Sequence, residues 1–554
     1  MREVTVTLPS GKSTVVPYGK RTGELLIEEG YLKDPNNTII GTLVNNEPTS
    51  LSFKIEINAE IRPITIESRE GIRIYRRSLC FLLAFASRYI FPDRKLVIGH
   101  SLGDGYYYYF IDYLPVHESD LRRLEEKMRE LSEEDLPIQR RVLSYTDALV
   151  LFEKSGQEDT RRLIEQRNTN KIPVYVCGDF TDLSHGPLAP NSGMIKTFEI
   201  KPYPNGFLLR YPSEQNLGKI EPFADSPLLF SVYQEYKAWG KILGVNSVSR
   251  LNELIEKNEI HSFIQVAEAL HNKKISEIAD RIYQRKGQVK VILIAGPSSS
   301  GKTTFTKKLG IQLRVLGFNP VIIELDNYFV PREKTPKDVN GEYDFESLHA
   351  IDVDLFNRNL LDLFEGKSAD IPDFDFKSGE RKSEYETLQL GDRSILLIEG
   401  IHGLNDELTP KISRDKKYLV YVSALTQLNL DDHNRISTTD NRLIRRMVRD
   451  SQFRGYSALE TLTRWPSVRN GENKNIFPFQ NNADSAFNSA LDYELSVLRI
   501  YAEPLLKTVK PYHQLYSEAV RILSFLENFT PLPAKYVPPE SILREFIGDS
   551  GFKY

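Results

Sequence analysis

A nine-residue stretch that begins at Gly296 has the residue types and the spacing of a phosphate-binding loop. It reads GPSSSGKTT and matches the pattern G-x-x-x-x-G-K-[ST]. The glycines allow a tight turn whose backbone N–H groups point at phosphate oxygens, and Lys302 adds a positive charge toward the β- and γ-phosphates. The hydroxyl of Thr303 is placed to bind Mg²⁺. We expect the whole loop to hold the phosphates of a nucleoside triphosphate: Gly296, Pro297, Ser298, Ser299, Ser300, Gly301, Lys302, Thr303 and Thr304.

Two acidic residues stand at the ends of apolar runs that follow this loop. Glu399 ends the run ILLIE, where a carboxylate can bind Mg²⁺; a strand-end glutamate that faces water is the alternative. Asp326 ends PVIIELD, at the edge of the predicted sheet where chemistry gathers. There its carboxylate can accept the proton of an attacking hydroxyl while Lys302 holds the γ-phosphate. The alternative for Asp326 is an Asx turn that starts the next loop.

Four arginines share one face of the helix predicted for NRLIRRMVRDSQFRG. Arg442, Arg445, Arg446 and Arg449 fall at positions i, i+3, i+4 and i+7. Such a face can close over a triphosphate as a lid and stabilise the charge of the transferring phosphoryl group. A solvated, salt-bridged helix surface and an RNA-contacting face are the two alternatives.

The segments that position these residues have the pattern of alternating strands and helices. VKVILIAG is a continuous apolar run, typical of a buried parallel strand, and the helix that follows the loop is expected to end at Gly317 and Pro320. PVIIELD, RSILLIEG and KYLVYVSA predict three more strands. Strands that alternate with helices predict a doubly wound parallel sheet within residues 288–554.

The residues before this sheet divide into three further units. Residues 1–67 have the alternation and turns of a small β-rich domain, and residues 68–225 mix helical periodicity with glycine-proline turns, which predicts an α+β domain. Residues 226–287 are helical almost throughout and are interpreted as a connector. The chain is thus expected to be a multidomain α/β protein.

Composition excludes several classes of protein. The 554 residues are 40% hydrophobic and 27% charged with a net charge of −4, so nothing indicates a global bias toward nucleic acid. Two cysteines are too few for a disulfide scaffold. The most apolar segment, LCFLLAFASRYIF, is short and contains Arg88, so we expect a buried helix and no membrane span. The opening MREVTVTLPSGK is strand-like and does not read as a leader, which favours a cytoplasmic location.

Six motifs occur in an order that resembles the uridine kinase branch of the phosphoribulokinase/uridine kinase family. They are GPSSSGKTT, LDNYF, YDFESLHAID, PDFDF, LLIEGIHGL and DNRLIRRMVRD, and the resemblance covers roughly residues 288–484. It implies transfer of the γ-phosphate of ATP, with Mg²⁺, to the 5′-hydroxyl of a pyrimidine nucleoside, most simply uridine, with cytidine as a second acceptor. Asp326 would be the general base assisted by Lys302, and Glu399 and Thr303 would serve Mg²⁺.

The same resemblance implies a substrate pocket and a lid, with two departures. The substrate-binding residues would be Phe329, Glu346, Phe374 and Arg442, and the lid would carry Arg445, Arg446 and Arg449. Family members often have a histidine shortly after the YDF motif, whereas this chain has FDFKSGER, with Gly379 near that position. They also more often have an aspartate where this chain has Glu346. Both departures concern recognition of the base and ribose and leave phosphoryl transfer intact.

The first 200 residues resemble two parts of threonyl-tRNA synthetase, the TGS β-grasp module and the editing domain. The editing domain carries an H-x-x-x-H pair and a later cysteine and histidine, but here those positions hold Arg77, Phe81, Ser184 and Leu188. A guanidinium accepts no metal bond, and Phe and Leu have no lone pair, so we expect neither zinc nor hydrolytic activity. His185 beside the lost cysteine is interpreted as a loop residue. A scaffold, a dimerisation surface, an RNA contact and a regulatory pocket remain as roles for this half.

Two other functions stay open on the sequence. One is an RNA- or translation-linked factor that uses the nucleotide as a switch. The other is a kinase whose acceptor is a different alcohol or a sugar phosphate. The oligomeric state is left open as well.

Overall fold

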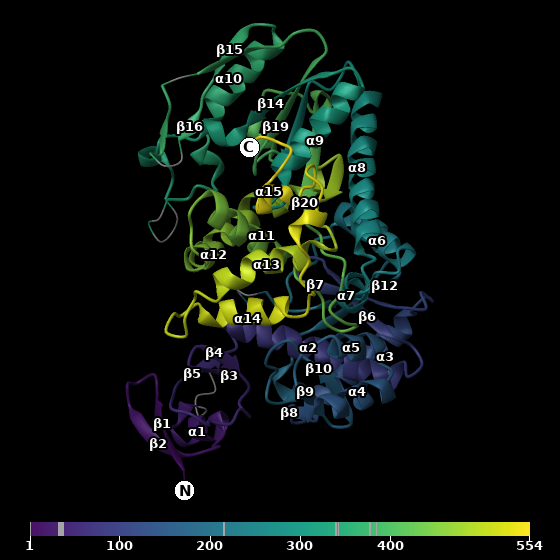
Figure 1. The fold of residues 1–554 in the computed structure, drawn as a ribbon, viewed down its shortest axis with the longest axis vertical. Coiled ribbons are helices and arrows are strands. Elements are labelled where there is room, and N and C mark those ends of the chain that lie inside the picture. The colour runs from purple at the N-terminus through teal and green to yellow at the C-terminus, as the bar shows by residue number, and fades with distance from the viewer. Residues whose placement is uncertain are drawn as a thin grey trace.

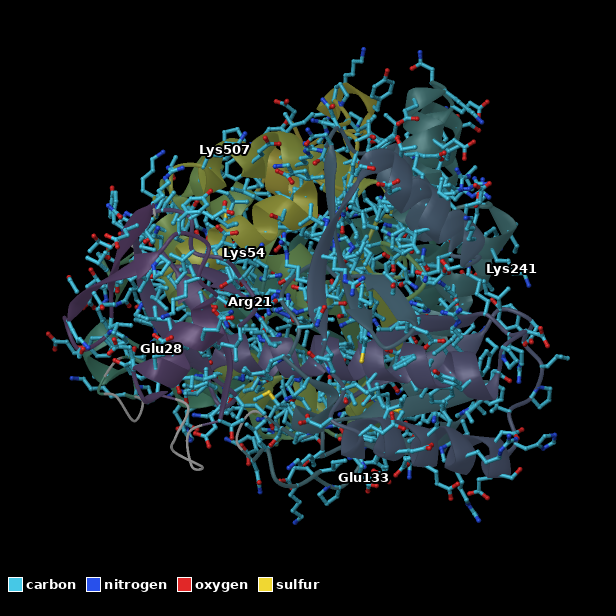
Figure 2. The ribbon with its side chains drawn as sticks, turned by 90° about the horizontal axis from the view of Figure 1, so that it is seen from below. Arg21, Glu28, Lys54, Glu133, Lys241 and Lys507 are labelled. Carbon is cyan, nitrogen blue, oxygen red and sulfur yellow. The ribbon has the colours of Figure 1, made fainter. Side chains whose placement is uncertain are left out.

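The computed structural model describes residues 2–31, 38–213, 216–337, 341, 343–375, 378–383 and 385–554. Figure 1 shows an elongated molecule with two smaller units at one end, a column of helices along one side and a larger α/β unit at the other end. Side chains that lie exposed at the end with the two smaller units include Arg21, Lys54 and Glu133 (Figure 2).

The first unit is a five-stranded sheet with one helix packed on it. The strand order is β2-β1-β5-β3-β4, in which β1 and β5 run parallel and the other pairs are antiparallel. Alternation in β1 buries Val4 and Val6 against Leu25 and Leu26 of α1, as a half-buried strand requires. The elements are β1 (Glu3–Thr7), β2 (Ser13–Pro17), α1 (Thr22–Glu28), β3 (Ile39–Val44), β4 (Glu47–Thr49) and β5 (Ala59–Thr65).

The second unit is built around the long helix α2 (Arg69–Ile90), which Ser68 caps by accepting a hydrogen bond from the Gly71 N–H. The predicted apolar segment forms the second half of α2, where Leu79 and residues 81–87 are buried, and none of the described helices is long and apolar enough to cross a membrane. Two antiparallel sheets pack with it, β11-β12-β7-β6 and β10-β9-β8. The remaining elements are β6 (Leu96–Ser101), β7 (Gly105–Phe110), α3 (Glu118–Glu133), β8 (Gln139–Ser144), α4 (Tyr145–Lys154), α5 (Glu158–Glu165), β9 (Lys171–Cys177), β10 (Phe180–Leu183), η2 (Ser192–Met194), β11 (Glu199–Tyr203) and β12 (Gly206–Arg210).

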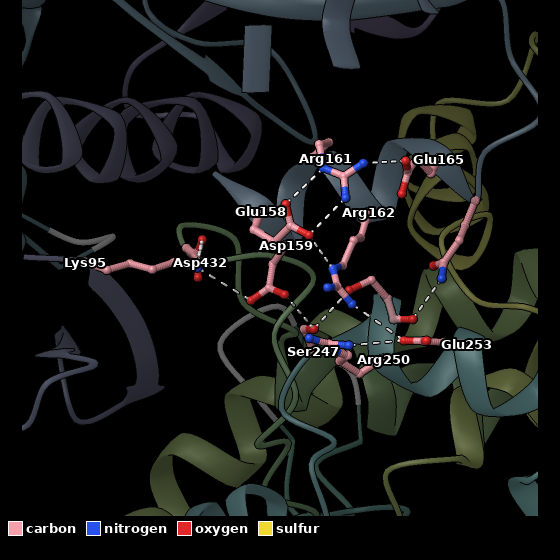
Figure 3. Close-up of polar contacts among 12 residues, drawn as sticks. Lys95, Glu158, Asp159, Arg161, Arg162, Glu165, Ser247, Arg250, Glu253 and Asp432 are labelled. Atoms are coloured by element: carbon pink, nitrogen blue, oxygen red, sulfur yellow. Dashed lines mark hydrogen bonds and ion pairs between the residues drawn. The ribbon is translucent and has the colours of Figure 1, made fainter. Parts of the chain in front are cut away.

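Three helices link this unit to the large one: α6 (Pro227–Ile242), α7 (Val248–Glu256) and α8 (Ile260–Gln284). Charged side chains join α5 to α7, and Lys95 lies between Asp159 and Asp432 of the large unit (Figure 3). The distance from Lys95 Nζ to Asp432 Oδ2 is 2.9 Å. The second unit is therefore in direct contact with the large unit as well as joined to it through the helices.

The large unit holds a five-stranded, fully parallel sheet in the order β14-β19-β13-β20-β21. In β13, Ile292 and Ile294 face one apolar cluster, and Val291 and Leu293 face another, so both sides of the sheet are covered. The predicted parallel sheet is confirmed. Its strands and first helix are β13 (Val291–Ala295), α9 (Lys302–Val315), β14 (Asn319–Glu324), β19 (Ser394–Glu399), β20 (Lys417–Ser423) and β21 (Ser485–Asn488).

The large unit contains further helices and short strands. They are η3 (Leu325–Tyr328), η4 (Arg332–Lys334), η5 (Leu348–Ala350), α10 (Val353–Phe364), β15 (Ser368–Ile371), β16 (Phe374–Asp375), β17 (Glu380–Arg381), β18 (Glu386–Gln389), η6 (Asp406–Leu408), η7 (Arg414–Lys416), α11 (Thr438–Phe453), α12 (Ala458–Asn475), η8 (Phe477–Asn482), α13 (Glu494–Leu506), α14 (Tyr516–Leu526), η9 (Ala534–Tyr536) and α15 (Arg544–Ile547). In Figure 1, α14 lies between the bulk of the large unit and the front half.

Contacts of α14 and its neighbours tie the large unit to both front units. Asn46 of the first unit donates a hydrogen bond to the carbonyl of Pro511, at 2.7 Å. Arg73 on α2 pairs with Glu518, which is buried. The front half is thus in contact with the same unit that holds the phosphate-binding loop.

Candidate functional site

The predicted phosphate-binding loop lies between β13 and α9 and has the backbone that its glycines allow. Gly301 has a φ of 81°, and a Cβ at Gly296 would come within 2.0 Å of the Val422 carbonyl oxygen. Only glycine fits at these two positions, because one needs left-handed backbone and the other has no space. The Lys302 Nζ lies 3.4 Å from the Pro297 carbonyl oxygen, at the start of α9 where the helix dipole favours anions.

The predicted metal ligands Thr303 and Glu399 are in direct contact. The Thr303 hydroxyl donates to Glu399 Oε1 at 2.8 Å, and Glu399 Oε2 is buried without a hydrogen-bond partner among the described residues. Burial raises the pKa of Glu399 to about 7; the neighbouring Lys302 lowers it, and Glu324 raises it further. A hydroxyl beside a carboxylate with an unused oxygen is a donor set that suits Mg²⁺, which would hold this carboxylate ionised.

Asp326 follows β14 at the same edge of the sheet. Its carboxylate is open to water but has many protein atoms around it. This partial desolvation raises its pKa, while Lys302, Arg454 and Arg449 lower it. Glu399 senses the charge of Asp326 as well as that of Lys302. The lysine and the two predicted carboxylates therefore lie within one electrostatic neighbourhood.

Two arginines of α11 support the loop from inside the protein. Arg442 is 1% exposed, pairs with both oxygens of the fully buried Glu472 and donates to the Ser298 carbonyl. Glu472 in turn accepts a hydrogen bond from the Ser298 N–H at 3.0 Å. Arg445 is fully buried, pairs with Glu494 and donates to carbonyls of the loop and its surroundings. This position behind the loop differs from the predicted places of Arg442 beside the substrate and of Arg445 in a lid.

The other two arginines of the predicted face remain partly open to solvent. Arg446 donates to the Ser298 hydroxyl at 2.7 Å and pairs with Asp450. Arg449 also pairs with Asp450 and contributes to the field at Asp326. The helical spacing correctly places the four arginines on one helix. Two of them, Arg442 and Arg445, support the loop from inside, and the other two remain accessible from the site. A lid role for Arg446 and Arg449 stays a prediction.

Apart from Arg442, the predicted substrate residues are Phe329, Phe374 and Glu346, and the pKa of Glu346 is raised in part by the charge of Asp326. Phe329 and Phe374 have ring centroids 5.6 Å apart, and Phe345 lies 6.4 Å from Phe329. Burial and the nearby Glu472 raise the pKa of Glu346 to about 7, whereas Arg446 lowers it. Aromatic rings and an acid thus border the space next to the predicted base, although their role toward a substrate stays a prediction.

The departure noted near Gly379 has a structural consequence. A Cβ at Gly379 would lie 2.8 Å from Arg332 Nε, and the Arg332 N–H donates to the Gly379 carbonyl. An arginine side chain therefore covers the position at which a histidine was expected. Phe376 and Lys377 of the same motif lie outside the described residues.

Several residues at the site had no signal in the sequence. Glu472 and Glu494 are buried partners of the arginines and come from α12 and the start of α13. Glu545 of α15 accepts hydrogen bonds from both the N–H and the hydroxyl of Thr304, at 3.1 and 2.6 Å, and the Tyr554 hydroxyl lies 2.8 Å from the same threonine oxygen. These contacts span up to 250 positions, so no local pattern could have predicted them.

The four positions compared with the editing domain line one cavity, which residues of the large unit also border. Arg77, Phe81, Ser184 and Leu188 all border it, and so does His185. Arg77 donates to the carbonyl of His185 at 3.2 Å. Burial lowers the pKa of His185, which therefore favours the neutral ring, with the Asp431 carboxylate opposing this.

Comparison with known proteins separates the two halves of the chain. The Phosphoribulokinase / Uridine kinase family matches residues 291–496, which include the loop, Asp326, Glu399 and α11. Threonine–tRNA ligases match the N-terminal region. The ligase of Geobacter sp. (strain M21) is 37% identical over 204 residues, which is 36% of this chain and 31% of the ligase. That of Hahella chejuensis is 39% identical over 161 residues, 29% of this chain and 24% of the ligase. The chain therefore spans about a third or less of the length of these relatives.

Solved structures with similarity include kinases. A "Possible Uridine Kinase" from Bacillus stearothermophilus is 18% identical, covers 39% of this chain and 98% of its own, and has a TM-score of 0.28. D-glycerate 3-kinase from Cryptococcus neoformans is 13% identical, covers 49% and 87%, and has a TM-score of 0.20. On the family match and the parallel sheet with its phosphate-binding loop, the C-terminal part of this chain carries a phosphoribulokinase/uridine kinase family domain, and the region before it is similar to threonine–tRNA ligase.

Proposed function

We propose that this protein is an ATP-dependent kinase that transfers the γ-phosphoryl group of ATP to the 5′-hydroxyl of uridine, with cytidine as a second acceptor. The observation that carries the proposal is the Thr303–Glu399 pair at 2.8 Å next to Lys302, with Asp326 in the same electrostatic neighbourhood. A protein that only binds a nucleotide needs the loop but has no need of a carboxylate in the position of Asp326. We also assign residues 1–67 to a TGS-like unit and residues 68–225 to an inactive editing-like unit.

Each residue of the site has a separate task in this reaction. Lys302 and the N–H groups of the loop bind the β- and γ-phosphates, and Thr303 and Glu399 would hold Mg²⁺. When bound, Mg²⁺ neutralises the charge that develops on the phosphate oxygens. Asp326 accepts the proton as the acceptor hydroxyl attacks, and the charges of Lys302, Arg449 and Arg454 keep its carboxylate ionised for that task.

The acceptor is argued from the aromatic walls and Glu346. Phe329 and Phe374 form a buried corner in which a planar base packs with its face against a ring. Glu346 accepts hydrogen bonds from the ribose hydroxyls when it is ionised. Arg332 lies beside Gly379, so a guanidinium occupies the place of the expected histidine.

A phosphorylated acceptor is the second candidate, and Arg332 is the observation that favours it. A guanidinium near the acceptor pocket binds a sugar phosphate more strongly than a neutral base, because a doubly charged phosphate forms bidentate hydrogen bonds with arginine. Both candidates use the same phosphate-binding loop and the same carboxylates, so only the identity of the acceptor distinguishes them.

The test is a coupled assay of ADP release with a panel of nucleosides, nucleoside monophosphates and sugar phosphates. We expect uridine to give the largest kcat/KM and Asp326→Ala to abolish the nucleoside-dependent rate. A sugar phosphate that exceeds uridine would establish the second candidate. A complete lack of acceptor-dependent turnover, together with RNA affinity that falls steeply with salt, would instead favour a translation-linked nucleotide-binding factor.

A further inference from the structure

We propose that the cavity between the second unit and the large unit binds a nucleotide that carries two or more phosphates, at a site separate from the phosphate-binding loop. The proposal goes beyond kinase activity, since it concerns a second ligand in the front half of the molecule. It rests on the size of the cavity, the charge of its walls and the aromatic side chains among them.

The cavity is large enough for a nucleotide and is formed by both halves of the chain. Its volume is about 1250 Å³. Known ligand pockets have volumes of about 300–1,000 Å³, so a nucleotide fits with room for water. One wall is α2 with the loop after β10, and the other comes from α11, α12 and α14. A ligand inside would therefore contact both units at once.

The walls of this cavity carry an excess of positive charge. Among the described residues that line it, ten are arginine and one is lysine, against six carboxylates. Some of these arginines are already neutralised, because Arg73 and Arg521 pair with the buried Glu518, and Arg521 also pairs with Asp440. The charge available to a ligand must come from the others.

Three other arginines of the cavity make side-chain contacts with carbonyl oxygens or with an aromatic ring. Arg77 donates to the carbonyls of Arg73 and His185, both at 3.2 Å. Arg435 lies over the ring of Tyr106, with its Cζ 5.3 Å from the centroid. Arg167 donates to the side-chain carbonyl of Asn528, and the carboxylates of Asp431 and Glu527 partly offset its charge. A carbonyl or a ring orients a guanidinium without cancelling its charge.

The surroundings of Arg77 disfavour its positive charge, and a bound anion would compensate for that. Burial and the neighbouring Arg73 lower the pKa of Arg77 to about 10, so it is still protonated at neutral pH. The side chain is also held in place by its hydrogen bonds to two backbone carbonyls, and it packs against Gly186, where a Cβ would come within 1.6 Å of Nη1. A positively charged group that is desolvated, fixed and surrounded by like charge is suited to bind phosphate.

Aromatic side chains among the lining residues make a nucleotide a better fit than an inorganic polyphosphate. Phe81, Tyr106, Tyr175 and Trp465 all border the cavity. The indole N–H of Trp465 is buried and has no hydrogen-bond partner in the described part of the chain. Tyr106 is the half-buried ring of the four and is the one against which a nucleobase can pack, whereas Phe81, Tyr175 and Trp465 are at most 5% exposed and close the wall behind it.

The occupant of the cavity would also touch the support of the phosphate-binding loop. Trp465 packs on Arg442, with the guanidinium Cζ 5.4 Å from the ring centroid, and Arg442 donates to the Ser298 carbonyl. A ligand against Trp465 is thus two contacts away from the loop.

The test uses the full chain with two background substitutions. Lys302→Ala weakens the phosphate-binding loop as a competing site. The sequence has two tryptophans, and Trp239→Phe leaves only Trp465 to report on binding. UTP, ATP and tripolyphosphate are titrated while Trp465 fluorescence is followed, and equilibrium dialysis gives the stoichiometry. We expect one saturable site at which the nucleotides bind more tightly than tripolyphosphate. Arg77→Ala and Arg435→Ala should each weaken binding by roughly tenfold to a hundredfold, the range for loss of a charge-assisted hydrogen bond.

Arg88→Ala is the matched control, because Arg88 lies on the same helix, is exposed and does not border the cavity. It should leave the affinity unchanged, and thermal unfolding checks that each variant is folded. The proposal is overturned if no nucleotide saturates the site below about 1 mM. It is also overturned if both cavity variants bind as tightly as their parent, or if a short single-stranded RNA binds the cavity and triphosphates do not displace it.

Discussion

Arginines line both the phosphate-binding loop and the front cavity, but some arginines of the cavity have no carboxylate partner in the contacts described above, unlike those behind the loop. Behind the loop, Arg442 and Arg445 are buried against Glu472 and Glu494, so their charges are cancelled. In the front cavity, arginines such as Arg77 are held by backbone carbonyls.

The difference shows that the number of arginines near a site does not indicate its charge. A buried arginine paired with a carboxylate adds structure: Arg442 and Glu472 together hold the backbone of Ser298 from both its N–H and its carbonyl side. The charge for phosphate at the loop comes from Lys302 and from backbone N–H groups. An arginine held by neutral oxygens keeps its charge for a ligand.

The largest effect is expected from Asp326→Asn, which removes the proton acceptor and keeps the size of the side chain. The value of kcat should fall by roughly 10²–10⁴-fold, the contribution of a positioned general base. Steady-state kinetics with uridine measure this, and nucleotide affinity in the front cavity should be unchanged because Asp326 is not among its lining residues. A kcat that stays within about threefold of the parent would remove Asp326 from the chemistry.

A smaller effect on stability is expected from Glu472→Gln. The change leaves Arg442 buried without its countercharge, and breaking a buried pair costs about 3–5 kcal/mol of unfolding free energy. The matched control is Glu118→Gln, which breaks the exposed pair with Arg122 on α3 and should cost about 0–1 kcal/mol. Denaturant unfolding of the full chain compares the two. Equal effects would mean that the pair behind the loop is no more than a surface ion pair.

The sequence was sufficient to predict the strands and the phosphate-binding loop that carry the site. The apolar runs that end in Asp326 and Glu399 correctly predict strands of a parallel sheet. The run before Glu399 is apolar because β19 is covered on both faces, whereas β14 before Asp326 is an edge strand in which Ile322 is 40% exposed. The glycines of the loop are required by local backbone geometry, which a short motif can encode. By contrast, β21 has only the four residues SAFN, too short and too polar to be recognised.

The rest of the site depends on contacts between distant residues. Spacing placed Arg442, Arg445, Arg446 and Arg449 on one face, but it did not indicate that Glu472 and Glu494 bury two of them. Nor could the sequence indicate that α14 joins both halves, because Glu518 meets Arg73 across 445 positions. Such partners are chosen by packing in three dimensions, which leaves no period in the sequence.

A pH effect of intermediate size is expected at Glu346. Its pKa is raised to about 7, so the carboxyl is protonated below that pH and ionised above it. If the ionised form accepts hydrogen bonds from the ribose, the KM for the nucleoside should rise by up to about tenfold for each pH unit below 7. Glu346→Gln should give a KM without this dependence, while kcat keeps its own pH profile. A KM that is independent of pH in the parent protein would exclude the ribose contact.

The smallest effect is expected at Glu545, which links the C-terminal segment to the loop. Its carboxylate accepts hydrogen bonds from the N–H and hydroxyl of Thr304, donors that the phosphates of ATP would also use. Glu545→Gln removes the negative charge, so ATP affinity should rise about two- to tenfold, measured by equilibrium dialysis. The control is Asp549→Asn, a neighbouring acid whose side chain is 95% exposed. A fall in affinity would instead mean that Glu545 stabilises the start of α9 through the helix dipole, and that the segment supports the loop as Glu472 does.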